Sequence, residues 1–291
     1  MICPSCKFTN TKYFYKYRDI KDQNFDLRCT SLDYRKPNLI KCKNCDLIFS
    51  ELSNFKFEDG YQDVVDDLYI EQISYKKKYF EIVLSKIKKY LNKSKDVLEI
   101  GSYYGVFGSL ISKHVKSYTG LELSKHAVDY SKKNYDLKFI NLSIKEYLKS
   151  LDKLDVIIMS HVIEHMDDVF NDIDNIKSKM SKDSVLIFST YNMDSLIARI
   201  LGKNYHWIMP MHKFYFSKKV LKKILEEKNL EIVETVSDTH VISLKYFFIK
   251  LCKILPFLNF LFYPLSKISF FNKINIKINL GDLDIYFVKI K

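Results

Sequence analysis

The chain has 291 residues, of which 47% are hydrophobic and 28% are charged, and its net charge is +12. These values exclude a disordered or fibrous chain and predict a globular protein with one main domain and a small accessory module. Only four of the 47 basic residues are arginines, so the charge indicates a solvated lysine surface rather than a nucleic-acid-binding one. The first residues, MICPSCKFTN, lack the apolar core of a signal peptide, which predicts a cytoplasmic protein with reduced cysteines.

Residues 1–50 carry five of the six cysteines and form the predicted accessory module. Four of them make two C-x2-C pairs, which predicts a structural zinc site in a ribbon with strands near 38–41 and 47–49: Cys3, Cys6, Cys42 and Cys45. Cys29 lies in the long loop between the pairs, and whether it joins the site stays open. Four sulfur ligands leave no free coordination position, so the ribbon is expected to stabilise the protein or present substrate.

A helical linker (51–95), with a helix expected over 70–91, precedes an alternation of apolar runs and helical segments. Strands are expected at Val97–Ile100, Tyr118–Leu123, Phe139–Leu142, Val156–Met159 and Val185–Ser189. Helices are expected at Phe107–Lys113, Lys125–Asn134, Ile144–Leu151 and Val162–Met180. This pattern predicts an α/β fold with a parallel sheet, whose ligands bind at the carboxyl ends of the strands.

The stretch DVLEIGSYYGVFG (96–108) concentrates three of the seven glycines, Gly101, Gly105 and Gly108. Their spacing does not fit the dinucleotide fingerprint, because Tyr103 stands at a required glycine, and no phosphate-binding Gly-Lys-Ser/Thr follows. A second acid, Glu122, ends the next predicted strand, where it can accept both hydroxyls of a ribose. Together these features favour a nucleoside cofactor without a pyrophosphate.

From Asp96 on, the chain resembles the class I S-adenosylmethionine-dependent methyltransferases. The stretches VLEIGSYYG, YTGLELSKHAVDYSKKN and LDVIIMSHVIEHMDD resemble three of their motifs, the last in its "VLEH" form, and TYNMDS and PMHKFYFSKK resemble a subgroup in which N-terminal zinc ribbons occur, several members acting on sugars. The resemblance implies a Rossmann-like seven-stranded sheet with an N-terminal zinc ribbon. It also implies that S-adenosylmethionine is bound by Glu99, Gly101, Ser102, Tyr103, Gly105, Glu122, Leu123, Ser143 and Ser160. At Tyr103 a turn with negative φ is expected to replace the usual glycine.

Histidines after the fourth strand indicate the chemistry. The chain lacks the Asn/Asp-Pro-Pro-Tyr/Phe element with which relatives methylate amino nitrogens, so a hydroxyl acceptor with a histidine base is favoured: His165, His212 or His161. The quinone-biosynthesis O-methyltransferases have a similar motif, which leaves open a divalent ion near Glu164 and His165. The loop carrying His206, Trp207 and His212 is expected to be a substrate lid, with aromatic faces suited to sugars or flat rings.

Residues 246–271 are unusually apolar, and their insertion (about 241–281) precedes a last, antiparallel strand expected at Asp284–Val288. Its uninterrupted part, Ile254–Leu265, is too short to span a bilayer and is broken by two prolines, so the segment either packs on the domain or contacts a membrane surface. The favoured function is O-methylation of a sugar or glycan intermediate, perhaps lipid-linked. The alternatives are a quinone or small-aromatic O-methyltransferase and a nucleic-acid-binding module on a degenerate methyltransferase fold.

Overall fold

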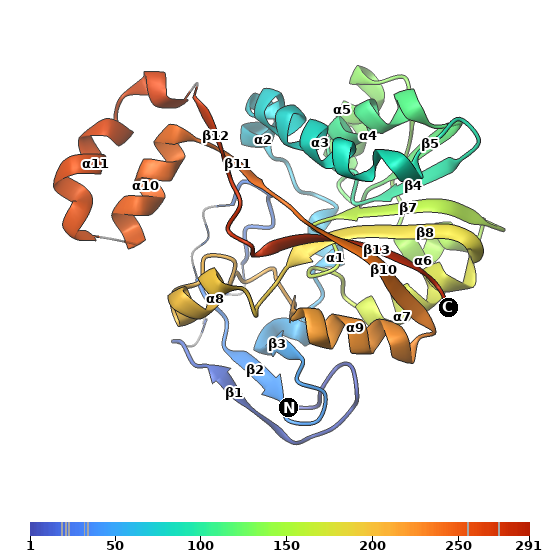
Figure 1. Cartoon of the computed structure of the whole chain (residues 1–291), viewed down its shortest axis with the longest axis horizontal. Helices are drawn as coiled ribbons and strands as arrows, with labels where there is room; N and C mark the ends of the chain where they lie inside the picture. The colour runs from blue at the N-terminus through green and yellow to red at the C-terminus, as the bar shows by residue number, and fades with distance from the viewer. Residues whose placement is uncertain are drawn as a thin grey trace.

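A seven-stranded sheet forms the centre of the molecule (Figure 1). The computed structural model describes residues 1–18, 20, 22, 24–31, 33, 35–254, 256–272 and 274–291, and only the backbone of Lys250, Lys253, Ile254, Pro256 and Asn272. The strand order is β10-β13-β8-β7-β4-β5-β6, with β13 antiparallel to both neighbours and the β4–β5, β4–β7, β5–β6 and β7–β8 pairs parallel. The strands are β4 (Asp96–Ile100), β5 (Ser117–Leu121), β6 (Lys138–Ile140), β7 (Leu154–Ser160), β8 (Met180–Tyr191), β10 (Leu230–Ser237) and β13 (Leu283–Ile290). The predicted parallel sheet and its antiparallel last strand are therefore confirmed.

Helices cover both faces of this sheet (Figure 1). On one face lie α3 (Ile73–Ile87), α4 (Val106–Ile111) and α5 (Lys125–Asn134), and on the other α6 (Ile144–Leu148), α7 (Val169–Ser178) and α9 (Lys218–Glu227). Successive residues of a strand point to opposite faces, so Val97 packs under α3 and α4 whereas Leu98 joins the core under α7 and α9. Both faces are thus apolar, and the polar side chains of these strands gather at their ends.

The segment from Val162 to Met180 was expected to be one helix, and this is wrong. Residues 162–168 form turns, α7 begins only at Val169, and Met180 already belongs to β8. The carbonyl oxygen of Glu164 accepts the backbone N–H groups of Lys213 (2.8 Å) and Phe214 (3.3 Å), and is therefore engaged outside any helix. The helix expected over 70–91 is likewise divided. The helix α2 (Asp67–Glu71) ends just before Gln72, and α3 begins just after it.

The N-terminal module forms a second sheet that includes a strand of the main domain. Its order is β1 (Thr11–Tyr15), β2 (Leu39–Cys42), β3 (Ile48–Ser50) and β9 (Phe214–Tyr215), so the expected ribbon strands are confirmed. Tyr205, Ile208 and Tyr215 share an apolar cluster with β2 and β3. The segment expected to be a substrate lid is instead packed between the ribbon and the sheet, which corrects that interpretation.

The apolar segment forms a helical hairpin between β10 and β13. Its stem pairs β11 (His240–Ser243) with β12 (Asn275–Ile278), and its helices are α10 (Leu244–Ile254) and α11 (Asn259–Ser266), while Leu255 lies outside the described residues. In Figure 1 the hairpin, coloured orange to red, projects from the side of the sheet. Two short helices complete the fold, α1 (Glu58–Tyr61) and α8 (Leu196–Leu201). Among the residues described here, no helix combines the length and apolar character needed to cross a membrane.

Candidate active site

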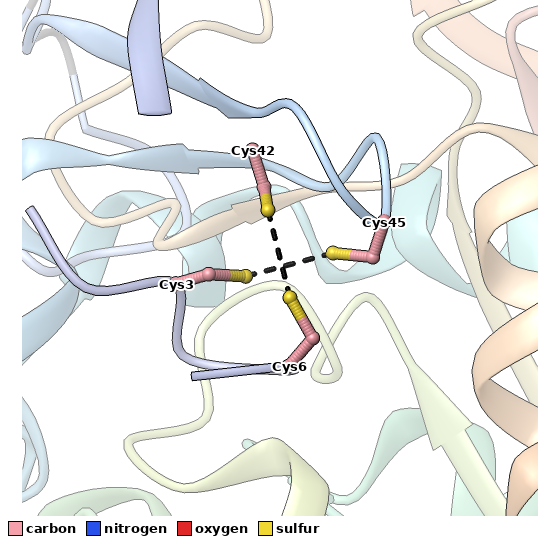
Figure 2. Close-up of side chains that lie close together, drawn as sticks. All are labelled: Cys3, Cys6, Cys42 and Cys45. Atoms are coloured by element: carbon pink, nitrogen blue, oxygen red, sulfur yellow. Dashed lines mark hydrogen bonds between the residues drawn. The ribbon is translucent and has the colours of Figure 1, made fainter. Parts of the chain in front are cut away.

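The four predicted zinc ligands converge at one point of the ribbon (Figure 2). The Sγ atoms of Cys3 and Cys45 are 3.5 Å apart, as are those of Cys6 and Cys42. Tetrahedral zinc with Zn–S bonds of about 2.3 Å places its sulfur ligands about 3.8 Å apart, so the residues fit the ion. Cys29 is exposed and is not one of the four. In this position zinc would fix the loops that flank β2 and β3, and through β9 the segment that carries His212.

The glycine loop follows β4 and has an unusual backbone. Gly101 (φ +71°), Tyr103 (φ +45°) and Gly105 (φ +72°) all adopt left-handed conformations. The expected negative φ at Tyr103 is therefore wrong: the tyrosine keeps the conformation that a glycine would have. A Cβ atom on Gly101 would lie 2.5 Å from Cγ2 of Val162, so no side chain fits between this loop and the turn after β7.

Tyr103 keeps this strained conformation because its side chain is anchored. Its hydroxyl donates to Asp66 (2.8 Å), a fully buried carboxylate that also accepts the backbone N–H of Thr30 at 3.1 Å. The hydroxyl of the neighbouring Tyr104 accepts the backbone N–H of Asp66 at 2.9 Å and lies 3.1 Å from Nδ1 of His126. Asp66 thus joins the glycine loop to the N-terminal module. Its hydrogen bonds offset the free-energy cost of the left-handed backbone at Tyr103.

Glu122 lies directly beside this loop. Its two carboxylate oxygens accept the backbone N–H groups of Tyr103 (2.9 Å) and Ser124 (2.8 Å). Burial raises the pKa of Glu122, while these backbone donors act in the opposite direction. Each carboxylate oxygen can accept a second bond, so the group is held in place with capacity left for two hydroxyls.

The remaining predicted cofactor residues lie in different environments. Ser102 is buried, and its Oγ has no hydrogen-bond partner within the described part of the chain. Leu123 and Ser160 lie half-buried at the same edge of the sheet, whereas Ser143 caps α6 by accepting the backbone N–H of Glu146 (3.3 Å). Glu99 faces inward, where Tyr118 donates to it, and Gly108 leaves room for that tyrosine because a Cβ there would lie 2.3 Å from its ring.

His161 follows β7 and is connected to a buried network. It has a left-handed backbone (φ +55°), and its Nε2 lies 3.1 Å from Oη of Tyr79. The Tyr79 hydroxyl donates to Asp238 (2.8 Å), which is fully buried and is also paired with Lys86 at 2.6 Å. Because that hydroxyl has a single hydrogen, it accepts from His161, so the hydrogen of a neutral His161 is on Nε2 and the lone pair is on Nδ1.

Glu164 faces that lone pair. His161 Nδ1 and Glu164 Oε1 are 3.7 Å apart, and neither atom has a hydrogen-bond partner among the described residues. Burial alone would raise the pKa of Glu164, but His161, His165 and His212 outweigh it and hold the pKa at about 2. Glu164 is therefore a buried carboxylate that stabilises positive charge on its neighbours.

His165 and His212 lie on the other side of Glu164. Their ring centroids are 4.6 Å apart, and His212 Nδ1 lies 2.8 Å from the carbonyl oxygen of Trp207, to which it can only donate. Burial lowers the pKa of both histidines, that of His212 to about 3. Glu164, His165 and His212 offer ligand atoms within 4.8 Å of one another, a set that could hold the divalent ion expected near Glu164 and His165.

Trp207 is stacked with neighbouring rings. Its ring lies 4.1 Å from that of Tyr191, with 21° between the planes, and 5.8 Å from that of His240, with 19° between the planes. The expectation that its aromatic surface binds a sugar or a flat ring stays a prediction. The stack joins the end of β8 to the stem of the hairpin.

Sequence reasoning missed Tyr79, Asp238 and Asp66. Asp238 follows β10, which runs parallel to β8, so its place at the carboxyl end of a strand is a signal that could have found it. Tyr79 is one of three aromatic residues in α3, and nothing in the local sequence distinguishes it.

Comparisons with known proteins agree with this geometry. A family model described as "Methyltransferase domain" matches residues 71–235. Two similar curated proteins are ubiquinone biosynthesis O-methyltransferases, from Coxiella burnetii (26% identical, 39% of this chain and 51% of the relative) and from Actinobacillus pleuropneumoniae (24%, 38% and 53%). The chain thus spans about half the length of these relatives.

Solved structures share the fold at low identity. A SAM-dependent methyltransferase from Archaeoglobus fulgidus is 20% identical, with a TM-score of 0.51 and coverage of 78% of this chain and all of the other. A methyltransferase from Thermotoga maritima, described as a possible histamine N-methyltransferase, is 18% identical, with a TM-score of 0.50 and coverage of 81% and 98%. The chain belongs to the methyltransferase domain family and has the fold of S-adenosylmethionine-dependent methyltransferases.

Proposed function

We propose that the protein is an S-adenosylmethionine-dependent O-methyltransferase in which His161 removes the proton of the acceptor hydroxyl. The observation that carries the proposal is the pair of unpartnered acceptor atoms, His161 Nδ1 and Glu164 Oε1, 3.7 Å apart at the carboxyl end of β7. A buried acceptor without a donor is costly, so a donor group of a bound molecule would be stabilised there.

The glycine loop fits the cofactor. Gly101 and Gly105 allow the backbone to approach a ligand closely, Glu122 keeps free capacity for two ribose hydroxyls, and Ser102 has an unpartnered hydroxyl. When bound, the cofactor supplies a methyl group on a sulfonium, open to in-line attack by a nucleophile. The protein's own contribution is alignment, exclusion of water and removal of one proton.

The network behind His161 fits that role. Asp238 and Tyr79 fix Nε2 as the protonated nitrogen, so Nδ1 is the basic atom. After the proton transfer His161 would be positive, and the adjacent Glu164 carboxylate would stabilise it. Of the three candidate bases, His212 is buried and its pKa is lowered to about 3, which makes it a weak base.

The acceptor class has two candidates. A hydroxyl of a sugar or glycan intermediate is supported by the resemblance to zinc-ribbon relatives that act on sugars. A quinone or other aromatic alcohol is supported by the names of the curated relatives, ubiquinone biosynthesis O-methyltransferases. Both candidates present a hydroxyl, so the proposed chemistry is the same.

Methyl transfer from isotopically labelled S-adenosylmethionine to catechol and to sugar nucleotides tests the proposal. We expect an O-methyl ether on one of these acceptors, and a rate that falls about 10²- to 10⁴-fold in His161→Asn, the range for loss of a general base. Affinity for S-adenosylhomocysteine should be retained in this variant. Methylation on nitrogen or carbon, or an unchanged rate in His161→Asn, would contradict the proposal.

A further inference from the structure

The α10–α11 hairpin has a small core of its own and an apolar outer surface. Phe248 is buried and stacks on Phe262 (centroids 5.5 Å apart) and against Phe271 (5.4 Å). Other apolar side chains of the hairpin remain exposed, with relative exposures from 37% to 79%: Tyr246, Ile249, Phe257, Phe260, Leu261, Tyr263, Ile268 and Phe270. We call these eight residues the hairpin face. So many exposed aromatic and aliphatic side chains on one projecting element mark an interaction surface.

The charge around the hairpin face has a single sign. Aspartate and glutamate make up 35 of the 291 residues, yet none occurs from Thr239 to Gly281, whereas lysines occur at positions 245, 250, 253, 267, 273 and 277. Lys267 is exposed and lies 4.8 Å from the ring of Tyr263. Aromatic side chains interspersed with lysines suit the boundary of an anionic bilayer, where rings enter the acyl region and ammonium groups reach the phosphates.

The size of the hairpin agrees with a surface position. Its helices have 11 and 8 residues, whereas about 20 are needed to cross a bilayer. Pro264 lies inside α11, which further shortens any continuous apolar helix. The element can therefore enter one leaflet without crossing the membrane.

The stem of the hairpin begins at the candidate active site. His240 in β11 bonds Asp282 (2.9 Å) and stacks with Trp207, and Asp238, two residues earlier, belongs to the His161 network. Tyr205 also donates to Asp282 (2.8 Å), which fixes the stem to the segment that precedes His212. An element that enters a membrane would thus hold the acceptor side of the site near the lipid surface.

We infer that the hairpin face binds an anionic lipid bilayer, and that the acceptor is carried on a lipid. The second part rests on the proposed function, whereas the first part needs neither cofactor nor acceptor. Vesicle binding and S-adenosylhomocysteine binding are separate measurements, so failure of one proposal leaves the other intact.

Vesicle co-sedimentation of the full chain tests the inference. We expect binding to equimolar phosphatidylcholine–phosphatidylglycerol vesicles, weaker binding to phosphatidylcholine alone, and weakening by salt. Phe257→Ser/Phe260→Ser removes the two most exposed aromatic rings and should weaken binding at least about tenfold. The matched control is Phe8→Ser/Tyr13→Ser, which removes rings that are 54% and 56% exposed on the ribbon and should bind vesicles like the wild type.

Because the substituted rings are exposed, the hairpin variant should keep its helical content, checked by circular dichroism. Absence of vesicle binding by the wild type, or equal binding by wild type and hairpin variant, would overturn the inference. A dimer in sedimentation equilibrium that dissociates in the hairpin variant would also overturn it, because the hairpin face would then be covered by a second copy.

Discussion

The carboxyl edge of the sheet has two halves that are built in different ways. The proposed cofactor half comprises Glu99, Gly101, Tyr103, Gly105 and Glu122, which lie within 24 consecutive residues. Three of them, Gly101, Tyr103 and Gly105, have left-handed backbones. The acceptor half comprises Tyr79, His161, Glu164, His212 and Asp238, which come from distant segments joined by side-chain hydrogen bonds. The proposed cofactor residues are therefore local in the chain, whereas the proposed acceptor residues depend on the whole fold.

Zinc removal should damage the acceptor half most. Loss of the ion would release β2 and β3, and with them β9 and the preceding His212. Because structural zinc stabilises small modules strongly, we expect the thermal midpoint to fall by about 10 °C or more after chelation, measured by calorimetry. S-adenosylhomocysteine affinity should change less than methyl transfer does.

Cys42→Ser should reproduce this loss, and Cys29→Ser should not, because Cys29 lies outside the four-sulfur cluster. A protein that binds no zinc when purified, or that keeps its midpoint after chelation, would show that the cluster is not a zinc site.

Gly101→Ala should break the cofactor half. The added Cβ would lie 2.5 Å from Val162 in a backbone with φ +71°, so the loop must move. We expect an approximately hundredfold loss of S-adenosylhomocysteine affinity in calorimetric titration, equivalent to about 3 kcal/mol. Gly281→Ala is the matched control, since its φ is +67° but nothing lies within 4 Å of the new Cβ. Equal affinity in Gly101→Ala and the control would refute the role of this loop.

Tyr79→Phe should weaken the acceptor half alone. The variant removes the hydroxyl that joins His161 to Asp238, and with it the fixed position of the Nε2 hydrogen. We expect kcat to fall about tenfold, the pH profile of kcat to shift, and cofactor affinity to stay unchanged. Tyr90→Phe, which loses a bond to Glu234 instead, is the control. If both variants show the same activity and pH profile, Tyr79 has no positioning role.

Glu99 should give the smallest effect, a change in stability with pH. Burial, with a contribution from Glu122, outweighs the Tyr118 bond and raises the pKa of Glu99 to about 8. The folded protein then binds this proton more tightly than the unfolded chain, so stability is lost as the pH rises from about 4.5 to about 8. Glu99→Gln keeps an acceptor for the Tyr118 hydroxyl. Over this pH range the thermal midpoint of the variant should fall by a few degrees less than that of the wild type. The exposed Glu231→Gln should leave the decline unchanged, and a Glu99→Gln profile that matches the wild type would refute this assignment.

The parallel sheet and the cluster of four cysteines could be predicted from the sequence, because each depends on spacing over a few residues. The residues of the glycine loop stay a prediction as cofactor ligands. Two details of those regions were wrong for physical reasons. Tyr103 keeps a left-handed backbone because Asp66, 37 residues away, bonds its hydroxyl. Residues 162–168 are not helical because Lys213 and Phe214 bond the Glu164 carbonyl. Of the acceptor half, the sequence analysis singled out His161, His212 and Glu164, whereas Tyr79 and Asp238 come from distant segments and could not be linked to them.

The proposed methyl transfer depends on binding of S-adenosylmethionine by the glycine loop and Glu122. Calorimetric titration of the zinc-loaded protein with S-adenosylhomocysteine, with Glu122→Ala as the comparison, tests it most directly. We expect micromolar binding that the substitution weakens by about 1–3 kcal/mol, the range for a lost hydrogen bond to a charged group. No binding by the folded wild-type protein, or equal binding by both proteins, would contradict it.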